Sequence, residues 1–106
     1  MSKATELESK VLRSIATNSY NECNYDTPAT FEYAANPIWM NLINDSGIPS
    51  GVTGKSLSGV CSSLSKKKFA SSYEDGNDST IMMTEEGWNA MIEFFGSHEE
   101  CFKGNK

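Results

Sequence analysis

An Asp-Gly step between two runs of β-compatible residues is the feature that most restricts the fold of this chain. Residues 69–74 (FASSYE) and 79–83 (STIMM) flank the tetrapeptide Asp75-Gly76-Asn77-Asp78. Asp-Gly favours the tight turns that join antiparallel strands, because glycine readily adopts the positive φ that these turns require. The pattern therefore predicts a β-hairpin.

Helical patterns lie directly before and after this hairpin. Residues 53–67 are predicted to form a helix capped by Thr53, and residues 85–95 a helix capped by Thr84. Each has one apolar face, as expected of a helix packed on a core. These faces consist of Leu57, Val60, Cys61 and Leu64 in the first helix, and of Trp88, Met91, Ile92 and Phe95 in the second.

A further helix is predicted near the N-terminus, over residues 4–19. Its apolar positions repeat with helical spacing, and its polar positions fall on the other side. The apolar stripe is Leu7, Val11, Leu12 and Ile15, and the solvent side is Glu6, Lys10, Arg13 and Asn18.

Residues 20–30 are rich in Asn, Asp, Thr and Pro and are predicted to be a loop, with a short extended piece at Phe31, Tyr33 and Ala34. A helix is expected over 37–46, since Pro37 suits the first helical position. Asn36 would cap this helix, Gly47 would end it, and Ile38, Trp39, Leu42 and Ile43 would form its apolar face. Trp39 and Trp88 are therefore both predicted to be largely buried.

Length and composition fit one small domain. The chain has 106 residues, of which 38% are hydrophobic, which is enough for a core without metal or disulfide. We assign residues 1–96 to a single domain and residues 97–106 to a polar, frayed tail. No apolar run approaches the length of about 18 residues that a membrane span needs. The expected location is cytoplasmic, with no membrane association.

The sequence carries no recognisable catalytic or metal-binding motif. The three cysteines lie far apart and match no zinc-site spacing, so structural thiols are expected. The single histidine, His98, leaves few routes to a catalytic pair, and no phosphate-binding glycine loop occurs. We therefore expect no catalytic residues, no metal, no cofactor and no enzyme activity.

Charge is distributed unevenly, although the net charge is −5. Residues 53–70 contain four lysines and no acid, whereas residues 71–106 contain eight acids and two lysines. The outward face of helix 53–67 is consequently small, hydroxylated and basic. Two explanations fit the serines and glycine of this face: close approach to another surface, or neutral drift of residues that face solvent. The lysines near the end of the helix also have a structural explanation, because cations there complement the helix dipole.

Residues 53–88 resemble the second half of a winged helix-turn-helix domain. Leu64, Lys66 and Lys67 match the end of the family's recognition helix, and Thr84 with Gly87 match the threonine-x-x-glycine that opens the next helix. The resemblance is close over about a third of the chain, and is greatest to short single-domain bacterial or phage proteins such as MarR-like regulators. It implies a mainly α fold with a small β-hairpin (α+β), a winged helix-turn-helix.

The resemblance implies a transcriptional regulator that binds double-stranded DNA with helix 53–67 in the major groove. A homodimer is expected, with the first and last helices as the dimer surface. The predicted DNA contacts are Lys55, Ser56, Ser58, Gly59, Ser62, Ser63, Lys66 and Lys67.

Two departures from the family pattern matter. Lys68 and Phe69 stand where the family has glycine and leucine, so a different helix cap is expected. The wing tip, Asp75-Gly76-Asn77-Asp78, is acidic and would be repelled by phosphates, so DNA contact should rest on helix 53–67. The alternative is a phage-type winged-helix protein that binds and inhibits or adapts a host protein through its acidic surface.

Overall fold

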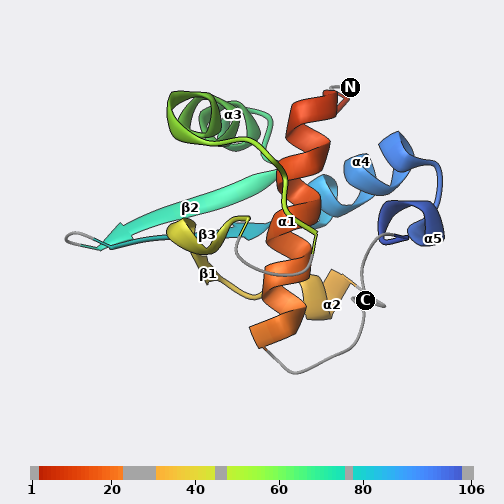
Figure 1. Ribbon diagram of the computed structural model, residues 1–106, viewed down its shortest axis with the longest axis horizontal. Helices are drawn as coiled ribbons and strands as arrows, with labels where there is room; N and C mark the ends of the chain where they lie inside the picture. Colours follow the sequence, from red (N-terminus) through yellow and green to blue (C-terminus); the bar gives the residue numbers. More distant parts are fainter. Residues whose placement is uncertain (1–2, 23–30, 45–47, 76–77, 104–106) are drawn as a thin grey trace.

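The computed structural model describes residues 3–22, 31–44, 48–75 and 78–103. Its elements are helices and a small antiparallel sheet, which confirms the expected α+β class. The central element is α1 (Glu6–Glu22), which passes between α3 on one side and α4 on the other (Figure 1). Within the described residues, no helix has the length and apolar character needed to cross a bilayer.

Helix α1 begins with a capping box that the sequence analysis missed. The Thr5 backbone N–H donates to Glu8 Oε1 (2.8 Å), and the Glu8 N–H donates to Thr5 Oγ1 (3.2 Å). The predicted burial of Val11, Leu12 and Ile15 is confirmed.

Two predictions for α1 were wrong, because other elements surround it and bury more than one stripe. Asn18, expected in solvent, is buried, and its side-chain amide donates to the Ser14 carbonyl (2.8 Å). Leu7, expected in the core, is 46% exposed.

The helix predicted over 37–46 does not form in the part that the structure describes, residues 37–44. This part of the chain contains a short helix α2 (Phe31–Ala34), a two-residue strand β1 (Ile38–Trp39) and a 3-10 turn η1 (Met40–Leu42). Isoleucine and tryptophan favour strands, and a neighbouring strand supplies their partners. The piece predicted to be extended, at Phe31, Tyr33 and Ala34, is helical. Of the predicted loop over residues 20–30, residues 20–22 belong to α1 and residues 23–30 lie outside the described residues, as does Gly47.

The hairpin prediction is confirmed by β2 (Ala70–Asp75) and β3 (Asp78–Met83), which pair antiparallel. Strand β1 adds to the other side of β3, so the sheet order is β1-β3-β2. Ile38 pairs with Ile81 on the buried face, and Trp39 pairs with Thr80. Trp39 is 49% exposed, so the prediction that it is largely buried was wrong.

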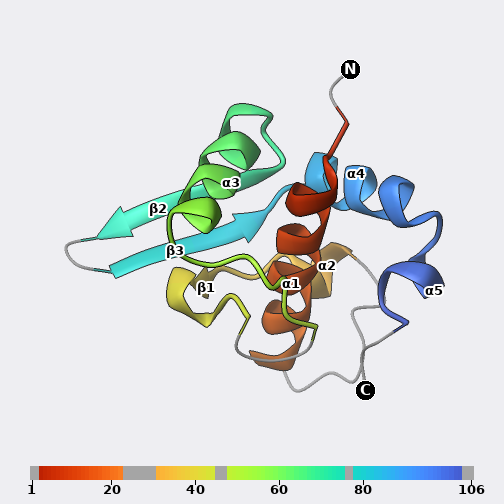
Figure 2. The same cartoon turned by 45° about the horizontal axis from the view of Figure 1, so that its top comes forward.

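Helix α3 (Gly54–Lys66) lies across the hairpin (Figure 2). Thr53 is its N-cap residue as predicted, although its side chain makes no capping hydrogen bond. At the other end, the Phe69 N–H donates to the Leu64 carbonyl and the Lys68 N–H to the Ser65 carbonyl. This is a Schellman motif with Lys68 at φ 65°, so the different cap expected from the sequence is wrong: lysine adopts the conformation usually taken by glycine.

Helix α4 (Glu85–Phe95) has the predicted bounds and the predicted cap, since Thr84 Oγ1 accepts from the Gly87 N–H (3.1 Å). Gly87 packs directly on the backbone of Phe69, where a side chain would clash with the carbonyl oxygen. The Thr84 hydroxyl also donates to the Lys68 carbonyl (2.6 Å). The threonine-x-x-glycine motif therefore joins α4 to the end of α3.

The prediction of a frayed tail from residue 97 was wrong over its described part. Helix α5 (His98–Cys101) follows, capped by Ser97, and Cys101 and Phe102 are buried. The Phe102 ring stacks on half-buried Trp88, with the ring centroids 5.8 Å apart. Burial raises the pKa of the Cys101 thiol to about 12, so this cysteine packs as a small apolar group.

Candidate nucleic-acid interface

The outward face of α3 carries most of the predicted contact residues in exposed positions. Lysines stand near both ends of this face, and small residues occupy its centre. The exposed members are Lys55, Ser56, Ser58, Gly59, Ser62 and Lys66. A Cβ added at Gly59 would meet nothing within 4 Å, so the helix surface is open there. Such a face allows another surface to approach the helix backbone closely.

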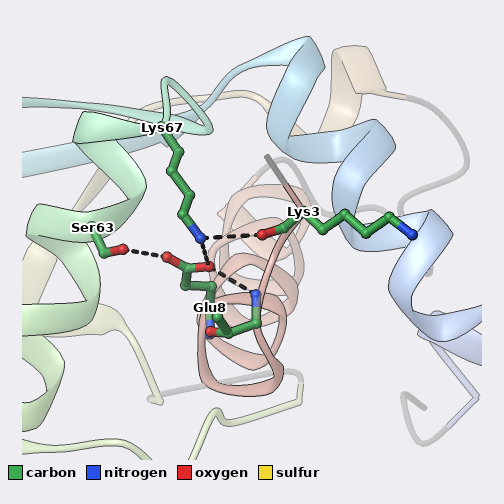
Figure 3. A network of polar contacts seen from close by, with 5 residues as sticks. Lys3, Glu8, Ser63 and Lys67 are labelled. Atoms are coloured by element: carbon green, nitrogen blue, oxygen red, sulfur yellow. Dashed lines mark hydrogen bonds and ion pairs between the residues drawn. The ribbon is translucent and has the colours of Figure 1, made fainter. Parts of the chain in front are cut away.

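Two predicted contact residues, Ser63 and Lys67, do not join this face. Both turn toward Glu8 of α1 (Figure 3). Lys67 Nζ lies 2.8 Å from Glu8 Oε1 and also donates to the Lys3 carbonyl (3.1 Å), while the Ser63 hydroxyl donates to Glu8 Oε2. These side chains therefore fasten the end of α3 to the start of α1.

Glu8 is the centre of this contact and was not predicted as an important residue. Its side chain is 3% exposed. Burial alone would raise the pKa of its carboxyl group, but the hydrogen bonds from Lys67, Ser63 and Thr5 outweigh burial and lower it. The Thr5-x-x-Glu8 spacing was the available sequence signal for the helix cap, although it did not indicate the partners on α3.

A shallow groove of about 560 Å³ lies between part of α3 and the sheet. Hydroxyl groups from both elements line it, together with one lysine and a few apolar side chains. The lining residues are Met40, Leu57, Ser58, Cys61, Ser62, Ser65, Lys66, Ser72 and Ser79. Serine hydroxyls both donate and accept hydrogen bonds, and Lys66 supplies a positive charge, so this lining suits phosphate and sugar oxygens.

Cys61 at the bottom of the groove is a packing residue. It is buried, its thiol lies 3.8 Å from the Met40 sulfur, and burial raises its pKa. A protonated thiol is a poor nucleophile and a poor metal ligand. Among the described residues, no group of three or more His, Cys, Asp and Glu side chains is placed to hold a metal ion.

Asn44 holds the loop that leads into α3. Its Oδ1 accepts from the Ser50 N–H (2.5 Å) and the Gly51 N–H (3.0 Å), and its Nδ2 donates to the Val52 carbonyl (2.9 Å). Asn44 itself has φ 78°, and its N–H donates to Ser14 of α1 (3.0 Å). One side chain thus positions the N-terminal end of α3 against the core, a role that the sequence did not indicate.

The predicted wing tip is described only in part. Asp75 and Asp78 pair at the end of the hairpin, whereas Gly76 and Asn77 lie outside the described residues. Asp78 directly precedes Ser79, which lines the groove beside α3. Because successive residues of a strand belong to opposite faces, the Asp75–Asp78 pair is placed on the sheet face opposite the one that carries Ser79 and the groove.

Comparisons of the chain with protein-family models, with curated proteins and with solved structures find no match.

Proposed function

We propose that this protein binds double-stranded DNA as a winged helix-turn-helix regulator, with α3 in the major groove. The observation that carries the proposal is the exposed face of α3, which combines lysines near both ends with small side chains between them. The small residues allow close approach to base edges, and Lys55 and Lys66 would neutralise phosphates.

The order of the elements supports this proposal. Along the chain the order is α1, α2, β1, η1, α3 and the hairpin β2–β3, which adds to β1. The 3-10 turn η1 stands where a helix before α3 was expected. The expected homodimer is supported by two exposed apolar side chains on the helices proposed as its surface, Leu7 of α1 and Phe94 of α4. Two copies would present two α3 helices to two half-sites.

The test is DNA binding by the full chain, measured by fluorescence anisotropy over a range of salt concentrations, first with a random duplex pool and then with the sequences it enriches. Lys66→Ala should weaken binding to every duplex and lower the salt slope by about 0.9. Ser58→Leu should instead reduce the preference for enriched over random sequences, because the face would no longer fit the groove.

Lys103→Ala is the matched control, since this exposed lysine lies beyond α5 and its loss changes the net charge by the same amount. Equal effects of Lys66→Ala and Lys103→Ala, or no duplex binding at low salt, would refute the proposal. The absence of DNA binding would favour the alternative, in which the acidic surface binds a host protein.

A further inference from the structure

The sheet has a solvent-exposed face with two aromatic side chains in one row. Trp39 of β1 and Tyr73 of β2 both pair with Thr80 of the central strand β3, so the three side chains lie side by side on one face. Trp39 is 49% exposed and Tyr73 is 70% exposed. Met82, in the neighbouring row of the same face, is 38% exposed.

This concentration of apolar surface has no role in the core. The opposite face of the sheet contributes Ile38 and Ile81, which are 2% and 1% exposed, so the fold already has its buried sheet face. Of the five large apolar side chains that are exposed in the described part of the chain, three lie on this one face. Contiguous exposed apolar patches on small proteins mark interaction sites.

The size of the patch favours a short segment of chain over a second folded copy. An aromatic side chain offers about 150–250 Å² of surface, so the exposed parts of these residues amount to roughly 300–400 Å². A stable protein–protein interface buries about 800 Å² on each partner. The exposed area of Trp39, Tyr73 and Met82 is about half of that.

The spacing of the rings matches one turn of a polyproline II helix. Two steps between neighbouring strands separate the Trp39 and Tyr73 backbones, a distance of about 9.6 Å. A polyproline II helix rises about 3.1 Å per residue and repeats every three residues, or about 9.3 Å. Prolines three residues apart would thus meet the two rings in turn, while the Trp39 and Tyr73 polar hydrogens can donate to the free carbonyls of such a peptide.

The charges on the strands distinguish between two kinds of ligand that bind exposed aromatic side chains, single-stranded nucleic acid and peptides. On this face the Asp75–Asp78 pair is the row next to Trp39, Thr80 and Tyr73, and strands β1, β2 and β3 contain no lysine or arginine. Single-stranded nucleic acid also stacks on aromatic residues, but it needs cations beside them for its phosphates. A peptide with a basic flank meets the opposite charge at the acidic end of the hairpin.

We propose that this face of the sheet binds a proline-rich peptide in the polyproline II conformation, with prolines three residues apart and a basic residue beside them. The site is separate from the outward face of α3, and its existence does not depend on DNA binding.

The experiment is a titration of the full-length protein with the synthetic peptide Pro-Pro-Ala-Pro-Pro-Ala-Arg-Arg, followed by calorimetry and by the NMR signals of the two tryptophan indoles. Saturable binding with a Kd of about 10–100 μM is expected, with the larger shift at the Trp39 indole. Tyr73→Ala and Trp39→Ala should each weaken binding about tenfold or more. Tyr73 is mostly exposed, so the Tyr73→Ala protein should remain folded.

Phe94→Ala is the matched control, because it removes a similarly exposed ring from α4. This ring belongs to the proposed dimer surface and not to the sheet, so peptide binding per chain should be unchanged even where dimerisation is weakened. Replacing the two arginines of the peptide by glutamates should abolish binding. The proposal is overturned by no saturable binding at millimolar peptide, by equal effects of Tyr73→Ala and Phe94→Ala, or by tighter binding of an oligo-dT strand. Lys66→Ala should not affect the peptide, which separates this site from that of the proposed function.

Discussion

Replacement of Gly87 by alanine is expected to destabilise the fold, because the added Cβ has no space. An ideal Cβ at this position lies 2.0 Å from the Phe69 carbonyl oxygen, whereas real Cβ contacts essentially never fall under 3.0 Å. The obstructing atom belongs to the backbone, so it cannot rotate away as the end of a flexible side chain would. Helix α4 and the segment that joins α3 to β2 must therefore move apart by about 1 Å.

The expected magnitude follows from the contacts that this movement strains. The Thr84 N–H donates to the Phe69 carbonyl (3.0 Å), and the Thr84 hydroxyl donates to the Lys68 carbonyl (2.6 Å). Overpacking costs about 1–3 kcal/mol, and each weakened hydrogen bond adds up to about 1 kcal/mol. Alanine's higher helix propensity offsets at most about 1 kcal/mol. The free energy of unfolding should therefore fall by about 2–4 kcal/mol.

Urea denaturation followed by far-UV circular dichroism measures this loss as a lower midpoint at an unchanged m-value. Gly59→Ala is the matched control, since Gly59 is also helical but an added Cβ there meets nothing within 4 Å. This control should gain about 0.5–1 kcal/mol. A Gly87→Ala protein within about 0.5 kcal/mol of the wild type would refute the packing argument.

Substitutions at three further residues test the contacts that hold α3 in place. The pKa of Glu8 is lower in the folded protein than the ordinary glutamate value of 4.5. The stabilisation from the ionised Glu8 carboxylate is therefore present above pH 4.5 and is lost as the pH falls through the folded-state pKa. The Glu8→Gln protein should be less stable than the wild type at neutral pH and should lose less stability on acidification, as measured by urea midpoints at several pH values. Lys68→Gly should raise the free energy of unfolding by about 0.5–1 kcal/mol because it relieves a left-handed lysine, whereas Lys68→Ala should give no gain in the same assay. Asn44→Ala should lower the free energy of unfolding, measured by thermal denaturation, by about 2–3 kcal/mol. Asn44→Gly restores the backbone freedom but not the side-chain hydrogen bonds, so it should recover only part of that loss. Full recovery would contradict the role given to the Asn44 side chain.

The elements from residue 53 to residue 95 were predictable from the sequence because local signals specify them. The Asp75-Gly76 step between two β-compatible runs predicted the hairpin, and Thr84 with the apolar spacing that follows it predicted α4 with its observed bounds. Caps, turns and helical periodicity act between residues close in the chain, so they are visible without the fold. The exposed residues of the α3 face were predictable for the same reason.

The tertiary structure decided what depends on partners distant in the chain. Residues 38–39 form a strand because β3 offers them an unpaired edge, and that same pairing places Trp39 in the same row as Tyr73 on the exposed sheet face. Lys67 and Ser63 have the helical spacing of contact residues, yet Glu8, more than fifty residues earlier in the chain, holds both of them. A buried carboxylate requires partners that satisfy its charge, and only the packing of α1 against α3 determines which side chains meet that requirement.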